Sequence, residues 1–223
     1  MDFLGRRIHF LGKACESMME LSVIIPARTG DERIQESKLR VLDWMLNHFP
    51  NSELILSVDT LGKGHGVKEG MLKVRGLYVV VMDVDLPVPF ESIIQAVSVL
   101  RDFNYDFVQG KRVHRNDPYG RRFLGWGFRA LVKHRTGLSL DTQCGFQVWK
   151  VNQAKWVIAS VKTDGYIWPV EFYLLAERMG FRTCELPVNW KYDPNSTVSL
   201  RKDILGMWHD LWHLSGMPNN VAE

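Results

Sequence analysis

LYVVVMDVD, residues 77–85, is an uninterrupted apolar run that ends in two carboxylates. A run of this length that is rich in valine is typical of a strand buried on both faces. Two similar runs precede it, LSVIIP at residues 21–26 and ELILSV at residues 53–58. Strands that are buried on both faces occur mainly in parallel sheets, so the three runs predict a buried parallel sheet.

Helical segments separate these runs. Apolar residues recur at helical spacing over residues 33–48, and glycines at 62, 64 and 66 open a loop that runs into a helix ending near residue 76. Strands that alternate with helices predict right-handed crossovers and an α/β fold with a mainly parallel sheet flanked by helices. Farther along we expect a helix after Pro89, strands at 105–109 and 146–149, a helix at 168–179, an edge strand at 181–188 and a last helix at 200–214.

The composition indicates a globular protein with a substantial core. The chain has 223 residues, of which 46% are hydrophobic and 24% are charged, and this fits a single domain. The net charge of +3 is too small to suggest a nucleic-acid partner. The three cysteines show no CxxC spacing, so we expect a reducing compartment and no zinc site.

No apolar run in the sequence approaches the roughly 18 residues that a membrane-spanning helix needs. Residues 1–19 place Arg6, Arg7 and Lys13 around an interrupted apolar stretch. This pattern favours an amphipathic lead-in helix on a membrane surface and, equally, a solvated helix that packs on the domain. Membrane contact, if present, is therefore expected to be peripheral.

The carboxyl ends of the predicted strands are where a ligand is expected in an open α/β sheet. Asp83 and Asp85 follow the third strand, and hard divalent cations prefer oxygen ligands of this kind. Such an ion would neutralise the charge of a leaving diphosphate. The pair alone is weak evidence, because two aspartates also occur as helix caps and in turns.

The glycine segment GKGHG, residues 62–66, precedes a predicted helix. Glycine permits close backbone approach, and a helix N-terminus attracts phosphate. The segment matches neither a Walker loop nor a Rossmann fingerprint. Taken alone, it is interpreted as a turn followed by a capped helix.

Six segments together resemble the family 2 glycosyltransferases, specifically the dolichyl- or polyprenyl-phosphate sugar transferases. DTQCGFQVWK (141–150) is the most specific match, and GKRVHR (110–115) resembles the Gly-Ser-Arg turn of that family. The others, in chain order, are SVIIPAR (22–28), GKGHGVKEGMLKVRG (62–76), VVVMDVDLPVPF (79–90) and WPVEFYLLAERMGFRTCELPVNW (168–190). The resemblance extends over about residues 20–212.

The resemblance implies a GT-A type fold in a single domain over residues 20–215. A nucleotide-binding half would occupy about 20–88 and an acceptor half about 89–215. The implied reaction is an inverting transfer of a hexose from UDP-glucose or GDP-mannose to a polyprenyl or dolichyl phosphate. It also implies a divalent cation, Mg²⁺ or Mn²⁺, and a peripheral location on the cytoplasmic face of a membrane.

Site residues follow from the resemblance position by position. The metal ligands would be Asp83 and Asp85, and Asp85 would take part in catalysis. Further catalytic positions, which would face the donor sugar or the acceptor, are Arg112, Gln143 and Glu171. The donor nucleotide would be held by Pro26, Ala27, Arg28, Asp59, Lys63 and Asp83. The acceptor would be held by Arg121, Arg122 and Arg129.

The sequence departs from the family pattern at three places. The family usually has a further αβ unit before the glycine segment, and one such unit is missing here. Arg28 replaces a common aromatic residue of the first motif. Pro169 stands where many members have an aspartate, although Glu171 is kept.

The loss of a carboxylate at Pro169 favours a phosphate acceptor. A hydroxyl acceptor needs a general base, whereas a phosphate oxygen is already anionic at neutral pH. The arginines interleaved with aromatic residues over residues 111–135 suit a phosphate, since arginine binds phosphate bidentately. A solvated basic helix face is the alternative, and Glu171 could equally be a surface carboxylate that pairs with Arg178.

Three other functions stay open at the level of sequence. The acceptor could be a saccharide hydroxyl, or the shortened domain could be a non-catalytic partner that binds nucleotide sugars. A nucleotidyltransferase shares a related sheet, but Arg28-Thr29-Gly30 only faintly matches its glycine- and arginine-rich signature.

The last helix, with Trp208 and Trp212, suits a membrane interface and equally a core.

Overall fold

The computed structural model describes residues 19–113, 117–193, 206–207, 210–212 and 214. Residues 1–18 of the predicted lead-in (1–19) and Trp208 lie outside the described residues. The elements, in chain order, are β1 (Leu21–Arg28), α2 (Ile34–His48), β2 (Ser52–Asp59), α3 (Lys63–Lys73), β3 (Tyr78–Met82), α4 (Glu91–Asp102), β4 (Phe107–Val113), α5 (Tyr119–Thr136), β5 (Phe146–Lys150), α6 (Val151–Ile158), α7 (Trp168–Arg178) and β6 (Thr183–Asn189).

One six-stranded sheet runs through the molecule in the order β2-β1-β3-β5-β4-β6. β1 pairs in parallel with β2 and β3, and β4 pairs in parallel with β6. Only β5 among these six runs the other way, antiparallel to both β3 and β4. The prediction of an α/β fold with a mainly parallel sheet is confirmed.

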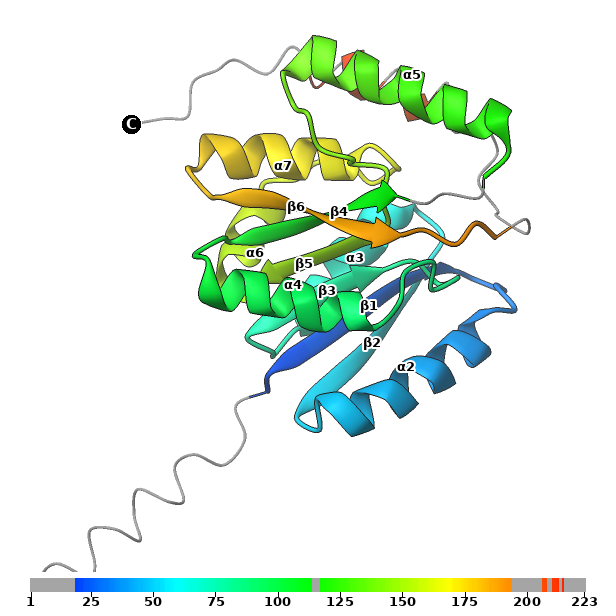
Figure 1. The fold of residues 1–223 in the computed structure, drawn as a ribbon, viewed down its shortest axis with the longest axis vertical. Helices are drawn as coiled ribbons and strands as arrows, with labels where there is room; N and C mark the ends of the chain where they lie inside the picture. Colours follow the sequence, from blue (N-terminus) through cyan, green and yellow to red (C-terminus); the bar gives the residue numbers. More distant parts are fainter. Residues whose placement is uncertain (1–18, 114–116, 194–205, 208–209, 213, 215–223) are drawn as a thin grey trace, which may run out of the picture.

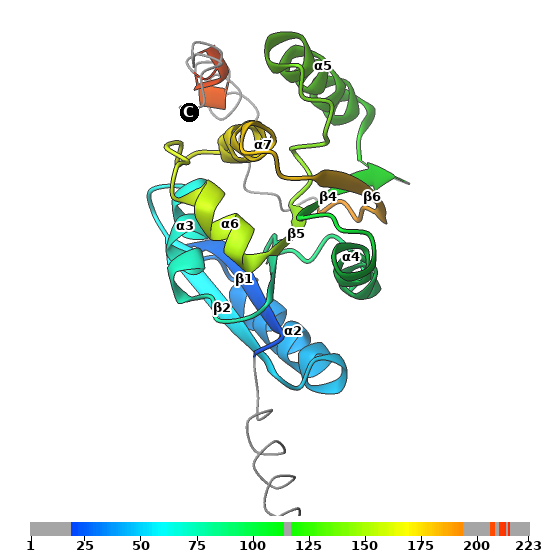
Figure 2. The same cartoon turned by 90° about the vertical axis from the view of Figure 1, so that its left-hand side faces the viewer.

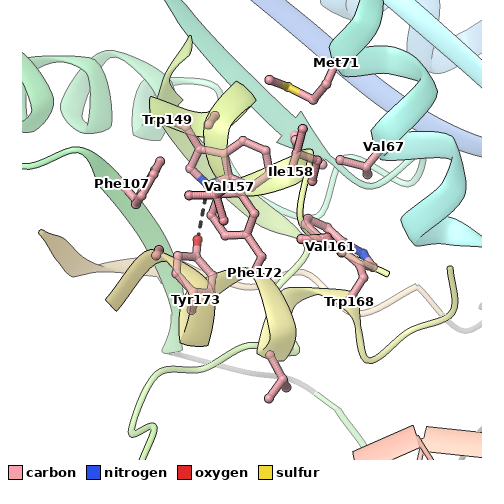
Figure 3. Close-up of a cluster of buried hydrophobic side chains, with 14 of the residues drawn as sticks. Val67, Met71, Phe107, Trp149, Val157, Ile158, Val161, Trp168, Phe172 and Tyr173 are labelled. Atoms are coloured by element: carbon pink, nitrogen blue, oxygen red, sulfur yellow. Dashed lines mark hydrogen bonds between the residues drawn. The ribbon is translucent and has the colours of Figure 1, made fainter. Parts of the chain in front are cut away.

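Helices cover both faces of the sheet and enclose two apolar clusters (Figures 1 and 2). α2 and α4 pack on one face, while α3, α6 and α7 pack on the other. The cluster under α3, α6 and α7 contains Trp149, which stacks on Phe172 with ring centroids 4.4 Å apart and meets Trp168 edge to face (Figure 3). The indole of Trp149 also donates a hydrogen bond of 3.3 Å to the hydroxyl of Tyr173. These contacts fix α7 against the middle of the sheet.

One helix and one strand, α2 and β2, lie between β1 and the glycine segment, as the sequence predicted. β2 consequently forms an edge of the sheet. The prediction of a loop at residues 62–66 is wrong, because α3 already begins at Lys63. Gly64 lies inside this helix. A Cβ at this position would lie 2.8 Å from the side chain of Trp168 and 2.9 Å from the carbonyl oxygen of Thr163, so no larger residue fits. Its glycine serves close packing rather than a loop.

The turn expected at residues 110–115 is also corrected over its described part. β4 continues to Val113, paired in register with β6 from Gly110 opposite Leu186 to Val113 opposite Asn189. A neighbouring parallel strand supplies hydrogen-bond partners for this backbone, so it stays extended. The short helix α6 was not anticipated, because its eight residues follow β5 without a break.

α5 lies beyond α7, away from the sheet (Figures 1 and 2). Phe128, Leu131 and Val132 on its inner side pack on the apolar cluster of α7, whereas Phe123 and Trp126 are exposed. Within the described part of the predicted last helix, residues 206–207, 210–212 and 214 are helical. No helix among the described residues is both long and apolar enough to cross a membrane.

The helix α3 approaches the strand β1 closely at Gly70. A Cβ on Gly70 would lie 2.7 Å from Cγ2 of Ile24, a fully buried residue of β1. We predict that Gly70→Ala lowers the free energy of unfolding by about 1–3 kcal/mol, because overpacking forces α3 away from the sheet. Chemical denaturation followed by circular dichroism measures the change.

Gly127→Ala in α5 is the matched control. A Cβ at this position meets no atom within 4 Å, so the substitution should keep or raise stability by up to about 1 kcal/mol through helix propensity. Equal stability of the two variants would contradict the packing that we infer at Gly70.

Candidate donor and metal site

A cavity of about 590 Å³ opens at the carboxyl ends of β1, β2 and β3. Its volume lies within the range of about 300–1,000 Å³ that small-molecule sites occupy. The parallel register places the last residues of β1 and β2, Arg28 and Asp59, opposite each other. Every residue that the sequence assigned to the donor nucleotide or the metal lines this cavity: Pro26, Ala27, Arg28, Asp59, Lys63, Asp83 and Asp85.

Two carboxylates with different surroundings stand where β3 ends. The amide of Asp83 donates a hydrogen bond of 3.2 Å to the carbonyl of Gly145, and a Cβ on Gly145 would collide with the Asp83 carboxylate. Burial, together with the negative charge of Asp83, raises the pKa of Asp85 to about 6. Only glycine fits at position 145, so the DTQCGF motif directly supports the acidic pair.

Lys63, the first residue of α3, forms an ion pair with Oδ1 of Asp83. Burial lowers the pKa of this ammonium, but the charge and hydrogen bond of Asp83 outweigh burial, and the net pKa is raised. Lys63 is therefore a cation at neutral pH. It brings a positive charge to the acidic end of the cavity.

Two further residue pairs in the cavity wall were not anticipated from the sequence. Arg28 donates a hydrogen bond of 2.8 Å to the hydroxyl of Tyr166, which comes from the loop between α6 and α7. Arg33 binds Asp31 bidentately at 2.9 and 2.7 Å, and this hydrogen bonding lowers the pKa of Asp31. The Thr-Gly-Asp turn after β1 hinted at Asp31, whereas no local pattern marked Tyr166.

The loop of residues 159–167, which carries Tyr166, is held by Glu171. Glu171 is 1% exposed, and its carboxylate accepts hydrogen bonds from the amides of Lys162 and Thr163 at 2.8–3.1 Å. The amide of Lys162 is shared between both carboxylate oxygens, and the hydroxyl of Thr163 donates a further bond of 2.7 Å. Glu171 does not line the cavity. Its contact with an acceptor stays a prediction, and its burial favours a positioning role.

The same loop covers the start of α3. The carbonyl oxygen of Asp164 accepts hydrogen bonds from the amides of Gly64 at 2.8 Å and His65 at 3.2 Å, and the Asp164 carboxylate pairs with Lys68. The sequence allowed either a phosphate or a cap at this helix terminus. These two amides are capped by the protein's own backbone, so a phosphate would have to be bound by other groups.

Arg112 and Gln143 lie together, but outside the cavity lining. The guanidinium of Arg112 binds Asp141 with hydrogen bonds of 2.9 and 2.8 Å, and Oε1 of Gln143 lies 3.5 Å from Nη2 of Arg112. Burial lowers the pKa of Arg112, and Asp141 raises it further than burial lowers it. Their contact with the donor sugar stays a prediction, since in this structure the charges of Arg112 and Asp141 satisfy each other.

The predicted acceptor arginines are placed by α5. Arg122 is exposed and lies over the ring of Tyr119, whereas Arg129 lies 3.8 Å from Oδ2 of Asp141. Neither lines the cavity, and the side chain of Arg121 lies outside the described residues. The structure therefore separates Arg122 and Arg129 from the donor cavity, and the contact of all three arginines with an acceptor stays a prediction.

The far end of the chain also reaches the cavity. Gly206, Met207 and Asp210 line it next to Gly165, although they lie more than a hundred residues beyond Asp85. Arg135 of α5 lies over the ring of Trp212 in the same helical stretch, 3.7 Å from the ring centroid. Nothing in the local sequence around Asp210 marked it as part of the site.

Comparisons with known proteins identify the family of the chain. The model of the family "Glycosyl transferase family 2" matches residues 36–149, half of the chain, and this span includes Lys63 and the acidic pair. Glycosyltransferase AglD of Haloferax volcanii is 29% identical over 171 residues, which cover 73% of this chain and 27% of AglD. Dolichyl-phosphate beta-glucosyltransferase of Saccharomyces cerevisiae is 27% identical over 222 residues, which cover 92% of this chain and 66% of the yeast protein.

Solved structures share the fold. Glucosyl-3-phosphoglycerate synthase from Mycobacterium tuberculosis, in complex with Mn²⁺ and UDP-glucose, matches with a TM-score of 0.62 and 18% identity, over 93% of this chain and 82% of that one. The GT-A type fold expected from the sequence is thereby confirmed. This chain spans between about a quarter and two thirds of the length of the two curated relatives named above. Since the family model matches half of its residues, the chain belongs to glycosyl transferase family 2.

Proposed function

We propose that this chain is an inverting hexosyltransferase that moves glucose from UDP-glucose to a polyprenyl or dolichyl phosphate. The cavity at the ends of β1–β3 carries the proposal, because it gathers the acidic pair, Lys63, Arg28 and Asp59 around one space of suitable size. The dolichyl-phosphate glucosyltransferases among the relatives support the acceptor and the sugar. In the proposed division, residues 20–88 bind the donor and residues 89–215 bind the acceptor.

The residues at the end of β3 fit a divalent cation, Mg²⁺ or Mn²⁺. Burial and, after it, the negative charge of Asp83 raise the pKa of Asp85, and a bound cation would offset both effects. The described residues contain no group of three or more His, Cys, Asp or Glu side chains suited to a metal. Two carboxylates with donor phosphates completing the shell are a usual arrangement for Mg²⁺. When bound, the ion supplies Lewis-acid stabilisation of the leaving diphosphate.

Other cavity residues would bind the rest of the donor. Arg28 and Lys63 provide the positive charge that a diphosphate needs. Asp59 accepts a hydrogen bond of 2.6 Å from the amide of Leu61 and contacts His65, and these bonds lower its pKa. It is therefore an ionised acceptor, well suited to the hydroxyl groups of a ribose or the N–H groups of a base.

A phosphate acceptor agrees with the surroundings of Glu171. A sugar hydroxyl would need a base at the reacting oxygen, but Glu171 is buried under the loop and uses its oxygens for backbone amides. A phosphate oxygen needs no such base. The exposed Arg122, Phe123 and Trp126 on α5 support a peripheral contact with the lipid surface on the cytoplasmic side, where basic and aromatic side chains are favourable.

The decisive test is transfer of labelled sugar from UDP-glucose or GDP-mannose to polyprenyl phosphate, with Mg²⁺ or Mn²⁺. We expect label from UDP-glucose in the lipid, and we expect Asp85→Asn to lower the rate at least about a hundredfold, because stabilisation of the leaving diphosphate is lost. Asp43→Asn, which changes an exposed carboxylate of α2, is the matched control and should keep the activity.

The other outcomes of this assay separate the competing functions. Transfer to a saccharide and none to the lipid phosphate would move the acceptor to a hydroxyl. Nucleotide binding without transfer to either acceptor would indicate a non-catalytic partner, and transfer from GDP-mannose alone would change the donor.

Glu171→Gln tests whether this residue positions the loop. We predict a loss of about 1.5–3 kcal/mol in unfolding free energy, since hydrogen bonds to a charged group are weakened, together with a higher KM for the donor and a kcat within about threefold of wild type. Thermal unfolding and steady-state kinetics measure these quantities. Glu177→Gln, an exposed change on the same helix, is the control. A large fall in kcat with unchanged stability would instead make Glu171 a catalytic base.

A further inference from the structure

The Asp83 carboxylate is enclosed on two sides. Its Oδ1 is paired with the ammonium of Lys63, and its Oδ2 lies against the backbone of Gly145, where no Cβ could be accommodated. The side chains of both members of the pair are largely covered, with 22% of Lys63 and 27% of Asp83 exposed. The ammonium of Lys63 therefore occupies an oxygen of Asp83 that a divalent cation would need as a ligand.

The backbone that carries Lys63 is fixed. A Cβ on Gly62 would collide with the carbonyl of Asp164, and the amides of Gly64 and His65 are bonded to that same carbonyl. Gly62 itself has a φ of +151°, which other residues rarely adopt. A displacement of the ammonium must therefore come from rotation of the flexible four-carbon side chain, not from movement of the helix.

A diphosphate bound in the cavity would give Lys63 an alternative partner. Lys63 lines the same space of about 590 Å³ as Asp83 and Asp85, so its ammonium can turn from the carboxylate toward a ligand without leaving the site. A diphosphate carries more negative charge than one carboxylate and binds an ammonium strongly. Once the ammonium has moved, Asp83 is free to bind a divalent cation.

We propose that Lys63 is a donor-operated latch on the metal site, which holds Asp83 until the diphosphate of the donor draws it away. The inference rests on the proposed function, because it needs a nucleoside diphosphate in this cavity. The latch makes metal and donor bind cooperatively, with the metal weakly held before the donor arrives. Linkage requires the reverse as well, so the metal raises the affinity for UDP by the same factor.

Mn²⁺ binding measured by electron paramagnetic resonance, with and without saturating UDP, tests the latch without any turnover. In the wild-type protein we expect UDP to tighten Mn²⁺ binding at least about tenfold, within the usual range of coupling between two sites. In Lys63→Met and Lys63→Gln we expect tighter Mn²⁺ binding without UDP and a coupling factor clearly below that of the wild-type protein, with the remaining coupling supplied by the phosphate oxygens that complete the shell of the metal. Two neutral variants guard against a misfolded protein, and thermal unfolding checks each of them.

Lys73→Met is the matched control, since it removes an exposed lysine from the last turn of the same helix. It should leave both affinities unchanged. If Lys63→Met shifts Mn²⁺ affinity by the same factor with and without UDP, its charge acts only through space and the latch is overturned. Absence of Mn²⁺ binding to the wild-type protein even with UDP would overturn the proposed function itself, and with it the latch.

Discussion

The parallel pairing of β1 with both β2 and β3 is the constraint from which the site follows. Parallel strands that share one register end at the same edge of a sheet, so Arg28, Asp59 and Asp83 are brought together although they are far apart in the sequence. The close approach of α3 to β1 at Gly70 fixes the helix that begins with Lys63 over this edge. The ends of β1, β2 and β3 and the start of α3 thus form the base of the cavity, and the loops complete its wall.

The loop between α6 and α7 is the second element that the site needs, and it is held from several sides. Glu171 holds its middle through backbone amides, and the Asp164 carbonyl binds the start of α3. The ion pair of Lys68 with the Asp164 carboxylate adds a third attachment. A buried carboxylate is costly unless its oxygens are satisfied, and four hydrogen bonds meet that need here. The position of Tyr166 on the cavity wall is a consequence of this anchoring.

Most of the fold could be predicted from the sequence, because buried parallel strands are continuous apolar runs that turn signals separate. The cavity-lining residues at the ends of β1, β2 and β3 could also be predicted, since they follow those runs directly. Two cavity residues, Tyr166 and Asp210, could not be predicted, because their positions depend on contacts between distant segments. They reach the cavity through the packing of α7 and the last helical stretch. The glycines of α3 were misjudged for the same reason, since only the position of Trp168 shows why position 64 must lack a Cβ.

Several charged side chains of the cavity already have a polar partner within the protein. Lys63 meets Asp83, Arg33 meets Asp31, His65 meets Asp59, and Arg28 donates to Tyr166. An unpaired charge in a partly buried site is unfavourable, so these contacts lower the cost of holding the charges there. Under the proposed function, a metal diphosphate would bind by an exchange of partners in which new ion pairs replace old ones. A ligand that presents only one of the two charges would break a pair without replacing it, so we expect the diphosphate and its cation to bind together.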